Sequence, residues 1–293
     1  MDLRLFDHQT NMASSSSLAP PSLTPVMKDG ECRNWAELPS DLTSWILSKL
    51  SAVDILQNAQ KVCTKWHRVC KDPAMWRKID MRNSGDLRYN LVMMCLVDSS
   101  IRSQRGFVEI DIWHFGTDSL LNYISHRSSN LRSLRLAVCY PITTYGLTDA
   151  LMKLPLLEEL EVSYCSLSAE SLEVVGQSCP NLKTLKLNRE VLHRFSFFSE
   201  DDDALAIAET MPRLRHLQLF GNKLTDADDG LKAILDNCPD LEHLDLGHCL
   251  NVNFSGDLEK RCSERIKVLG RPGSERIFDF SIFEDSVTLD TDY

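Results

Sequence analysis

Residues 131–139, LRSLRLAVC, indicate the fold of most of this chain. Leu131, Leu134 and Leu136 are spaced as L-x-x-L-x-L, and Cys139 follows the last leucine by three residues. Side chains alternate along a strand, so these leucines point into a core while the residues between them point out to the opposite face. The same form recurs at Leu157-Leu160-Val162, Leu182-Leu185-Leu187, Leu214-Leu217-Leu219 and Leu241-Leu244-Leu246, with a looser copy at Phe107-Ile110-Ile112 and a first strand expected at Trp76-Ile79-Met81.

These copies are regularly spaced, as in a repeat architecture. Their starts from Phe107 onward are 24, 26, 25, 32 and 27 residues apart, and self-similarity on this scale is typical of solenoids. Further columns recur at Cys139, Cys165 and Cys249, at Cys179-Pro180 and Cys238-Pro239, and at Leu224 to Asp226. Together they resemble the cysteine-containing class of leucine-rich repeat. The resemblance implies an α/β, right-handed solenoid with parallel strands on the concave face and helices on the convex face.

A different pattern precedes the repeats, in LPSDLTSWILSKLSAVDILQNAQKVCTKWHRVCKDPAMW, residues 38–76. Steps of four residues from Leu38 through Ile46 to Leu50 predict one helix, with Ser40 or Asp41 as its N-terminal cap. A second helical stretch is expected to begin at Ser51 and Asp54 and to end at Pro73. Helices of this size have too little core to be stable alone, so the rest of the chain or a partner should cover them.

The same residues resemble the F-box family pattern along its whole length. The matching positions are Leu38-Pro39, Ile46, Leu50, Asp54-Ile55-Leu56, Val62-Cys63, Trp66, Asp72-Pro73 and Trp76. The resemblance implies docking on a Skp-type adaptor and, through it, on a cullin ubiquitin ligase. The implied adaptor-facing residues are Leu38, Pro39, Leu42, Ile46, Leu50, Leu56 and Val62. Alternatively, several of them only pack the helices together, as is expected for Cys63 and Trp66.

The predicted organisation has four parts. Residues 1–30 are Ser- and Pro-rich and are expected to be disordered. An F-box spans 34–80, leucine-rich repeats with about seven strands span 76–269, and an acidic tail spans 270–293. Leu87 to Val97 should form the helix of the opening repeat. The tail either covers the open end of the array through Ile277, Phe278, Phe280 and Phe283 or extends into solvent.

A protein target is expected on the face formed by the residues between the repeat leucines. The candidate target-binding residues are Glu109, Asp111, Trp113, Arg135, Glu159, Glu161, Lys186, His216, Phe220, His243 and Asp245. Trp113 and Phe220 are expected to be exposed aromatic contacts, against the alternative of a merely solvated strand face. His216 and His243 should lie about 5 Å apart on neighbouring strands, and we interpret them as surface histidines rather than a metal site.

The long interval after Leu187 is a second candidate for target binding. Phe195, Phe197 and Phe198 precede the acidic run Asp201 to Asp203, and insertions in repeat arrays often bind partners. The phenylalanines could equally pack back onto the solenoid. The acidic run could equally begin a helix, where the helix dipole favours anions.

Composition and missing motifs exclude other classes of function. A formal charge of -10 with a pI near 5.3 argues against nucleic-acid binding, and the longest apolar run, Leu91 to Val97, is too short to span a membrane. No secretory signal is evident, so the ten cysteines are expected to be thiols in the nucleus or cytoplasm. Nucleophile elbow, P-loop and zinc-protease motifs are absent from the sequence. The F-box and leucine-rich-repeat resemblances therefore imply a receptor subunit of a ubiquitin ligase, and the missing motifs predict no catalytic residues, metal or cofactor. The alternative is a repeat scaffold that acts without the ligase.

Overall fold

The computed structural model describes residues 35–81, 98–99, 101–104, 106–165, 168–189, 201–222, 224 and 229–274. The chain divides into two units, Met1–Trp35 and Ala36–Tyr293, and the features below belong to the second, except for Trp35 at the start of η1. Four predictions lie outside the described residues: the disordered lead at 1–30, the helix at 87–97, the phenylalanines at 195–198 and the packing of the tail.

Short helices form the N-terminal module, and they divide the chain more finely than the sequence pattern predicts. They are η1 (Trp35–Glu37), α1 (Ser40–Leu47), α2 (Ala52–Gln57), η2 (Ala59–Lys61), α3 (Thr64–Val69) and η3 (Pro73–Trp76). The prediction of one continuous stretch from Ser51 to Pro73 is wrong. Cys63 is extended and starts a new helix by accepting the Trp66 N–H through its sulfur. Pro73 occupies the first turn of η3, which Asp72 caps.

The second helical stretch begins at Ser51 as predicted. Ser51 caps α2, since its hydroxyl accepts the Asp54 N–H at 3.1 Å and donates to the Asp54 carboxylate at 2.8 Å. For α1 the predicted cap is wrong, because Ser40 and Asp41 already lie within the first turn and Pro39 is the capping residue. Its carbonyl accepts both the backbone N–H and the side-chain hydroxyl of Thr43, each at 2.9 Å.

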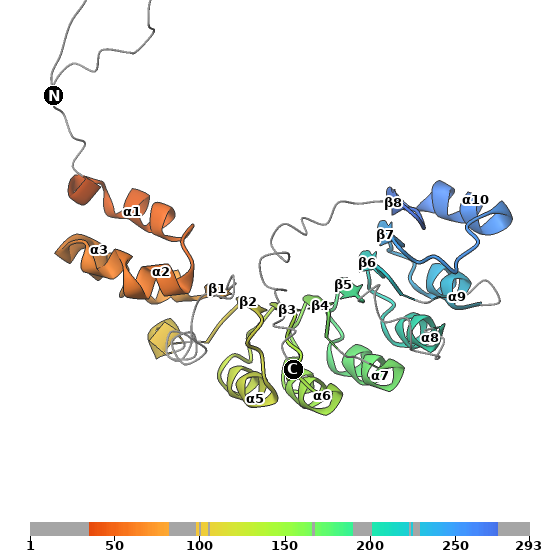
Figure 1. The fold of residues 1–293 in the computed structure, drawn as a ribbon, viewed down its shortest axis with the longest axis horizontal. Coiled ribbons are helices and arrows are strands. Elements are labelled where there is room, and N and C mark those ends of the chain that lie inside the picture. Colours follow the sequence, from red (N-terminus) through yellow and green to blue (C-terminus); the bar gives the residue numbers. More distant parts are fainter. Residues whose placement is uncertain are drawn as a thin grey trace, which may run out of the picture. The chain divides into compact units, whose positions relative to one another are not determined.

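The repeats form one parallel sheet whose strands follow the order of the sequence. The strands are β1 (Lys78–Met81), β2 (Glu109–Trp113), β3 (Ser133–Ala137), β4 (Glu159–Ser163), β5 (Thr184–Asn188), β6 (His216–Gln218), β7 (His243–Asp245) and β8 (Val268–Gly270). The helices between them are α5 (Asp118–Arg127), α6 (Thr144–Leu151), α7 (Ala169–Ser178), α8 (Asp201–Thr210), α9 (Asp229–Asn237) and α10 (Gly256–Arg265). Figure 1 shows these helices along one side of the sheet.

The core lies between the sheet and these helices, where the sequence pattern predicts it. Leu134, Leu160 and Leu185 occupy equivalent positions on neighbouring strands, and each is fully buried. Leu120, Leu121 and Ile124 supply the buried face of α5. Burying one such side chain is worth about 1.5–3 kcal/mol, and the stack repeats along the array. The predicted fold class is confirmed: a helical N-terminal module is followed by a strand-and-helix solenoid.

The described cysteines are free thiols and most of them are buried. Cys139, Cys179, Cys238 and Cys249 lie at the corners of the repeats. The Cys249 thiol donates to the Leu219 carbonyl at 2.7 Å and the Cys139 thiol to the Ala137 carbonyl at 3.3 Å. Burial raises the pKa of Cys179 to about 12 and that of Cys238 to about 11, so both stay protonated. These thiols pack the corners, as expected. No helix among the described residues is long and apolar enough to cross a membrane.

Trp76 joins the helical module to the sheet. Its side chain is fully buried, and β1 begins two residues later. The indole Nε1 donates to the Cys70 carbonyl at 2.8 Å. Arg102 donates to that same carbonyl and to Gln60, at 3.2 Å each, with its guanidinium 5.4 Å from the Trp76 ring centre. The two modules therefore share one packed junction.

Candidate adaptor-docking and target-binding surfaces

The N-terminal helices expose apolar side chains that the core does not use. Val62 is 60% exposed, Leu42 48% and Leu50 38%, and Pro39 is also exposed. Leu38 and Ile46 are half-buried. Six of the seven predicted adaptor-facing residues are therefore at least partly exposed, as a docking surface requires.

Leu56 is the exception, and its predicted adaptor-facing position is wrong. It is only 4% exposed, because α2 also buries Ala52, Val53 and Ile55 and so packs most of its surface inside the module. Leu56 therefore belongs to the core of the helices, which is the alternative that the sequence left open for this set.

Trp45 is an exposed residue that the sequence pattern missed. Its side chain is 63% exposed on α1, and the Lys49 ammonium lies 5.3 Å from its ring centre. Trp45 follows Leu42 by three residues and so shares its face of the helix. A search by steps of four alone passes over this position, whereas combined steps of three and four find it.

The strands of the repeat sheet carry two rows of polar side chains. The parallel register aligns Glu109, Ser133, Glu159, Thr184, His216 and His243 in one row, and Asp111, Arg135, Glu161, Lys186, Gln218 and Asp245 in the next. Most of these side chains are half-buried. The structure therefore brings nearly all predicted target-binding residues onto one face.

Ion pairs link the middle of this face. Arg135 donates to Glu159 at 3.0 Å, and Lys186 donates to Glu161 at 3.2 Å. Burial opposes the charge on Arg135, but the hydrogen bond to Glu159 and the charges of the nearby acids outweigh it and raise the pKa of Arg135. For Glu159, burial is likewise outweighed by Arg135, and the pKa of this carboxyl is lowered. The pairs hold these side chains in a defined arrangement at neutral pH.

Phe220 is buried, so the prediction of an exposed aromatic there is wrong. Its side chain is 1% exposed. Strand β6 ends at Gln218, so Phe220 lies in the following turn, where the alternation of a strand no longer applies. Its ring centre lies 4.7 Å from that of His248, and a Cβ on Gly247 would approach the Phe220 ring to 3.0 Å. The missing side chain at Gly247 thus makes room for this ring.

Asp245 is the second predicted target-binding residue that proves to be buried. Its side chain is 8% exposed, and its Oδ1 accepts the Gly247 N–H at 3.0 Å. A Cβ on Gly270 would lie 2.1 Å from that oxygen, so the glycine of the next strand permits the inward position. The outward positions at Ala137, Ser163 and Asn188 are also buried. Among the described residues, the accessible positions of this face are therefore the first two rows of β1–β6, together with Trp113, His243 and Val268.

Trp113 was predicted to be an exposed aromatic contact, and its side chain is half-buried. Its indole Nε1 donates to the Asp111 carboxylate at 2.7 Å, and its ring meets that of His114 edge to face with centres 6.5 Å apart. Part of the ring remains accessible at the end of β2. Trp113 thus stays a candidate contact, in an orientation held by Asp111.

His216 and His243 are neighbours, as the repeat register predicts. Their ring centres lie 4.2 Å apart. Burial lowers the pKa of His216 below 6.5, and a positive charge on His243, Lys186 or Arg215 would lower it further, while Glu242 acts in the opposite direction. Among the described residues, His, Cys, Asp and Glu side chains form no group of three or more suited to a metal ion.

We expect the His216 ring to titrate below its usual pKa. The lowered value means that the unfolded chain binds this proton more tightly than the folded chain, so His216 opposes folding as the pH falls through 6.5. NMR titration of the imidazole should show a midpoint below 6.5. In His243→Gln the midpoint should move up but stay below 6.5, because burial remains the larger cause. An unchanged midpoint in this variant would show that the two rings do not interact.

The sequence left open whether the acidic run Asp201 to Asp203 belongs to a binding loop or begins a helix, and the structure shows the helix. Helix α8 begins at Asp201, and the Arg189 guanidinium contacts the buried Asp203 carboxylate. The same arginine donates to Asn222 at 2.9 Å. This side of the interval between β5 and β6 is thus anchored to the solenoid.

A helical module with exposed apolar side chains, fused to a strand-and-helix array, defines a repeat protein with an N-terminal helical domain. A model of the F-box-like family matches residues 35–82. F-box protein SKIP19 of Arabidopsis thaliana is 61% identical over 276 residues, covering 92% of this chain and 86% of that protein. F-box/LRR-repeat protein 22 of the same plant is 51% identical over 288 residues, covering 94% and 91%.

The chain belongs to the F-box/leucine-rich-repeat family. F-box/LRR-repeat protein 23 of Arabidopsis thaliana is 59% identical over 272 residues, which cover 91% of this chain but 60% of that protein. The chain thus spans less than two thirds of this relative. Among solved structures, a chain of the yeast Rad7 and Elc1 complex is similar at 18% identity with a TM-score of 0.44, over 68% of this chain and 58% of that chain.

Proposed function

We propose that this protein is a substrate-recognition subunit of a Skp–cullin–F-box ubiquitin ligase. F-box proteins in general are non-catalytic receptor subunits of such ligases, and the match to the F-box-like family covers the whole helical module. In this proposal the module docks a Skp-type adaptor and the strand face receives a protein target. The receptor acts by holding the target near the ligase machinery, which is an effect of proximity.

The observation that carries this proposal is the exposure of Leu42, Leu50 and Val62 on a module whose core is complete without them. Leu47, Ile55 and Val69 fill the interior, and Trp76 seals it against the sheet. Apolar side chains left outside a completed core favour a partner that covers them. The alternative is a scaffold that binds a partner without assembling a ligase.

Adaptor binding by purified protein separates these functions. We expect a Skp-type adaptor to bind the chain, and Leu42→Ala with Val62→Ala to weaken that binding by about tenfold or more, since central apolar contacts each contribute about 1 kcal/mol or more. Isothermal titration calorimetry measures both affinities. Leu250→Ala, at a 70% exposed leucine beyond β7, is the matched control and should bind as the unmodified chain does.

Absence of adaptor binding by the unmodified chain would favour the scaffold. Equal affinity of Leu42→Ala/Val62→Ala and the unmodified chain would place docking elsewhere. We further propose that the protein works in the nucleus or the cytoplasm and that a protein, rather than a nucleic acid or a membrane, is its target. Imaging of a fluorescent fusion tests the location.

A further inference from the structure

Helix α3 and the short helix η2 before it carry a strongly basic surface. Residues 61–71 contain four Lys or Arg side chains and no Asp or Glu, in a chain whose formal net charge is -10. Lys61, Arg68 and Lys71 are exposed, and Lys65 is half-buried. Positive charge is thus concentrated in this part of the helical module, although the chain as a whole is acidic.

Local contacts place the three exposed bases close together. Arg68 and Lys71 are three residues apart, and the Lys71 N–H donates to the Arg68 carbonyl at 3.1 Å at the end of α3. The His67 ring nitrogen Nδ1 lies 3.2 Å from the Gln60 carbonyl, which brings the end of η2, and with it Lys61, beside α3. Like charges spaced this closely repel each other. Lys61, Arg68 and Lys71 therefore form a basic patch that an acidic partner would stabilise.

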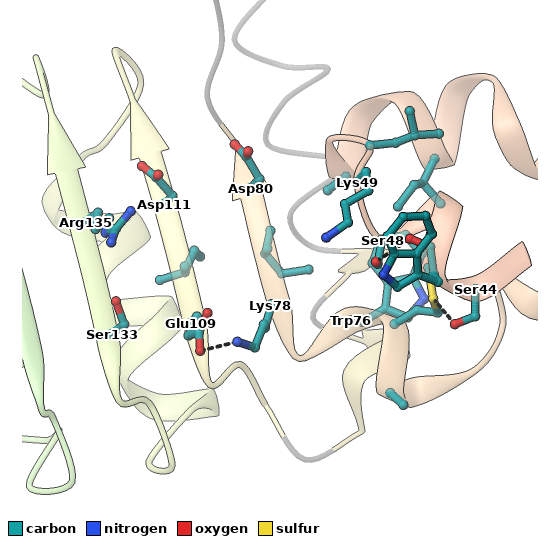
Figure 2. A pocket seen from close by; sticks show the side chains of 18 of the residues that line it. Ser44, Ser48, Lys49, Trp76, Lys78, Asp80, Glu109, Asp111, Ser133 and Arg135 are labelled. Carbon is teal, nitrogen blue, oxygen red and sulfur yellow. Dashed lines mark hydrogen bonds and ion pairs between the residues drawn. The ribbon is translucent and has the colours of Figure 1, made fainter. Parts of the chain in front are cut away.

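The basic patch is not neutralised within the part of the chain that the structure describes. None of its three side chains forms an ion pair there. The acids nearest in sequence, Asp54 and Asp72, accept hydrogen bonds within the caps of α2 and η3. By contrast, Lys78 at the start of β1 pairs with Glu109 of β2 at 2.5 Å, and Figure 2 shows these two side chains facing each other. The charge of the basic patch therefore remains for a partner to match.

The basic patch lies among the apolar side chains that are proposed to dock the adaptor. Val62, 60% exposed, directly follows Lys61. The Lys65 ammonium, on the same helix as Arg68, contacts the Leu38 carbonyl next to the exposed Pro39. Bases and apolar residues thus belong to one surface, and a partner that covers the apolar side chains also meets the positive charge.

We propose that the basic patch is part of the adaptor-docking surface, where it receives an acidic surface of the adaptor and steers its approach. This inference rests on the proposed receptor function and names the chemistry of its partner. Attraction between complementary charges raises association rates by about 10- to 1,000-fold, whereas apolar contacts act mostly on dissociation. Because the chain as a whole is acidic, an acidic adaptor is repelled from other faces and is oriented towards the helical module.

Stopped-flow association of the full chain with a Skp-type adaptor tests the proposal. Lys61→Gln, Arg68→Gln and Lys71→Gln, combined in one variant, remove three charges and keep polar side chains. We expect the association rate constant to fall about tenfold at low ionic strength, with a change of less than about twofold in the dissociation rate constant. Added salt should slow the unmodified chain towards the rate of the variant, because it screens these charges. This salt dependence tests the proposal without any substitution.

The matched control removes three bases from other parts of the surface. Arg213 and Arg215 precede β6 and Lys260 lies on α10, and all three are exposed. Arg213→Gln, Arg215→Gln and Lys260→Gln together should leave the association rate nearly unchanged. Equal slowing in both triple variants would assign the effect to the overall charge of the chain and would overturn the proposal, as would association of the unmodified chain that does not depend on salt. Thermal unfolding of each variant confirms that it is folded.

The inference and the receptor function beneath it fail separately. Absence of adaptor binding by the unmodified chain would remove the receptor function itself. Adaptor binding at a rate independent of Lys61, Arg68 and Lys71 would leave that function in place and overturn the role of the basic patch. Binding of a DNA duplex that the Lys61→Gln/Arg68→Gln/Lys71→Gln variant loses, with unchanged adaptor kinetics, would overturn it too and would assign the patch to nucleic acid.

Discussion

Replacing Trp76 by alanine is expected to lower the free energy of unfolding by about 3–5 kcal/mol, the range for aromatic-to-alanine changes in a packed core. The side chain is fully buried at the junction of helices and sheet. Its removal deletes the hydrogen bond to Cys70 and the ring that lies beside Arg102. Urea denaturation followed by circular dichroism measures the loss, and adaptor affinity should fall once the helical module is loosened.

Trp76→Phe is the matched control for this change. Phenylalanine keeps much of the apolar volume and loses the N–H donor, but the Cys70 carbonyl still accepts from Arg102 at 3.2 Å. We therefore expect a smaller loss, about 1–2 kcal/mol. A Trp76→Ala variant as stable as the unmodified chain, or one whose helical module unfolds in a separate transition, would show that the junction is not a shared core.

The strands were predictable because two local rules act in the same direction. Alternation in a strand and burial of one face require L-x-x-L-x-L, and β3, β4 and β5 lie where that pattern predicts them. The parallel register then follows from repetition, and it brought His216 beside His243. Patterns of this kind need no knowledge of distant residues.

The corrected residues depend on distant contacts that no local pattern contains. Phe220 is buried because Gly247, one repeat later, leaves space for its ring, and Asp245 turns inward because Gly270 does the same. Leu56 matches the F-box pattern as the exposed Leu42 and Leu50 do, but it is buried in the core of the helical module. Such outcomes are decided by what the neighbouring repeat or helix places opposite the residue.

The packed junction has a consequence for the proposed receptor. Trp76 and Arg102 connect the helical module to the first repeat through the Cys70 carbonyl, so docking module and strand face belong to one compact unit. A receptor that places its target by proximity gains from such a fixed connection, because a flexible linker would dilute the effective concentration of the target at the ligase.

Gly106→Ala is expected to destabilise the fold by about 3 kcal/mol or more, for two separate physical reasons. Gly106 has a φ of 77°, a conformation that costs other residues about 1–3 kcal/mol. An added Cβ would also lie 2.2 Å from the Arg127 carbonyl oxygen and 2.8 Å from the Ser128 Cα. Both are backbone atoms, so the clash requires movement of the end of α5, where the Ser128 hydroxyl also accepts the Phe107 N–H at 2.9 Å.

Gly256→Ala isolates the conformational part of this effect. Gly256 has a φ of 65°, but a Cβ there would meet nothing within 4 Å, so we expect a cost of only about 1 kcal/mol. Urea denaturation of the two variants under the same conditions gives the difference directly. Equal losses would mean that the loop before β2 shifts away from α5 without cost, and that close backbone packing at Gly106 does not contribute to the stability of the first repeats.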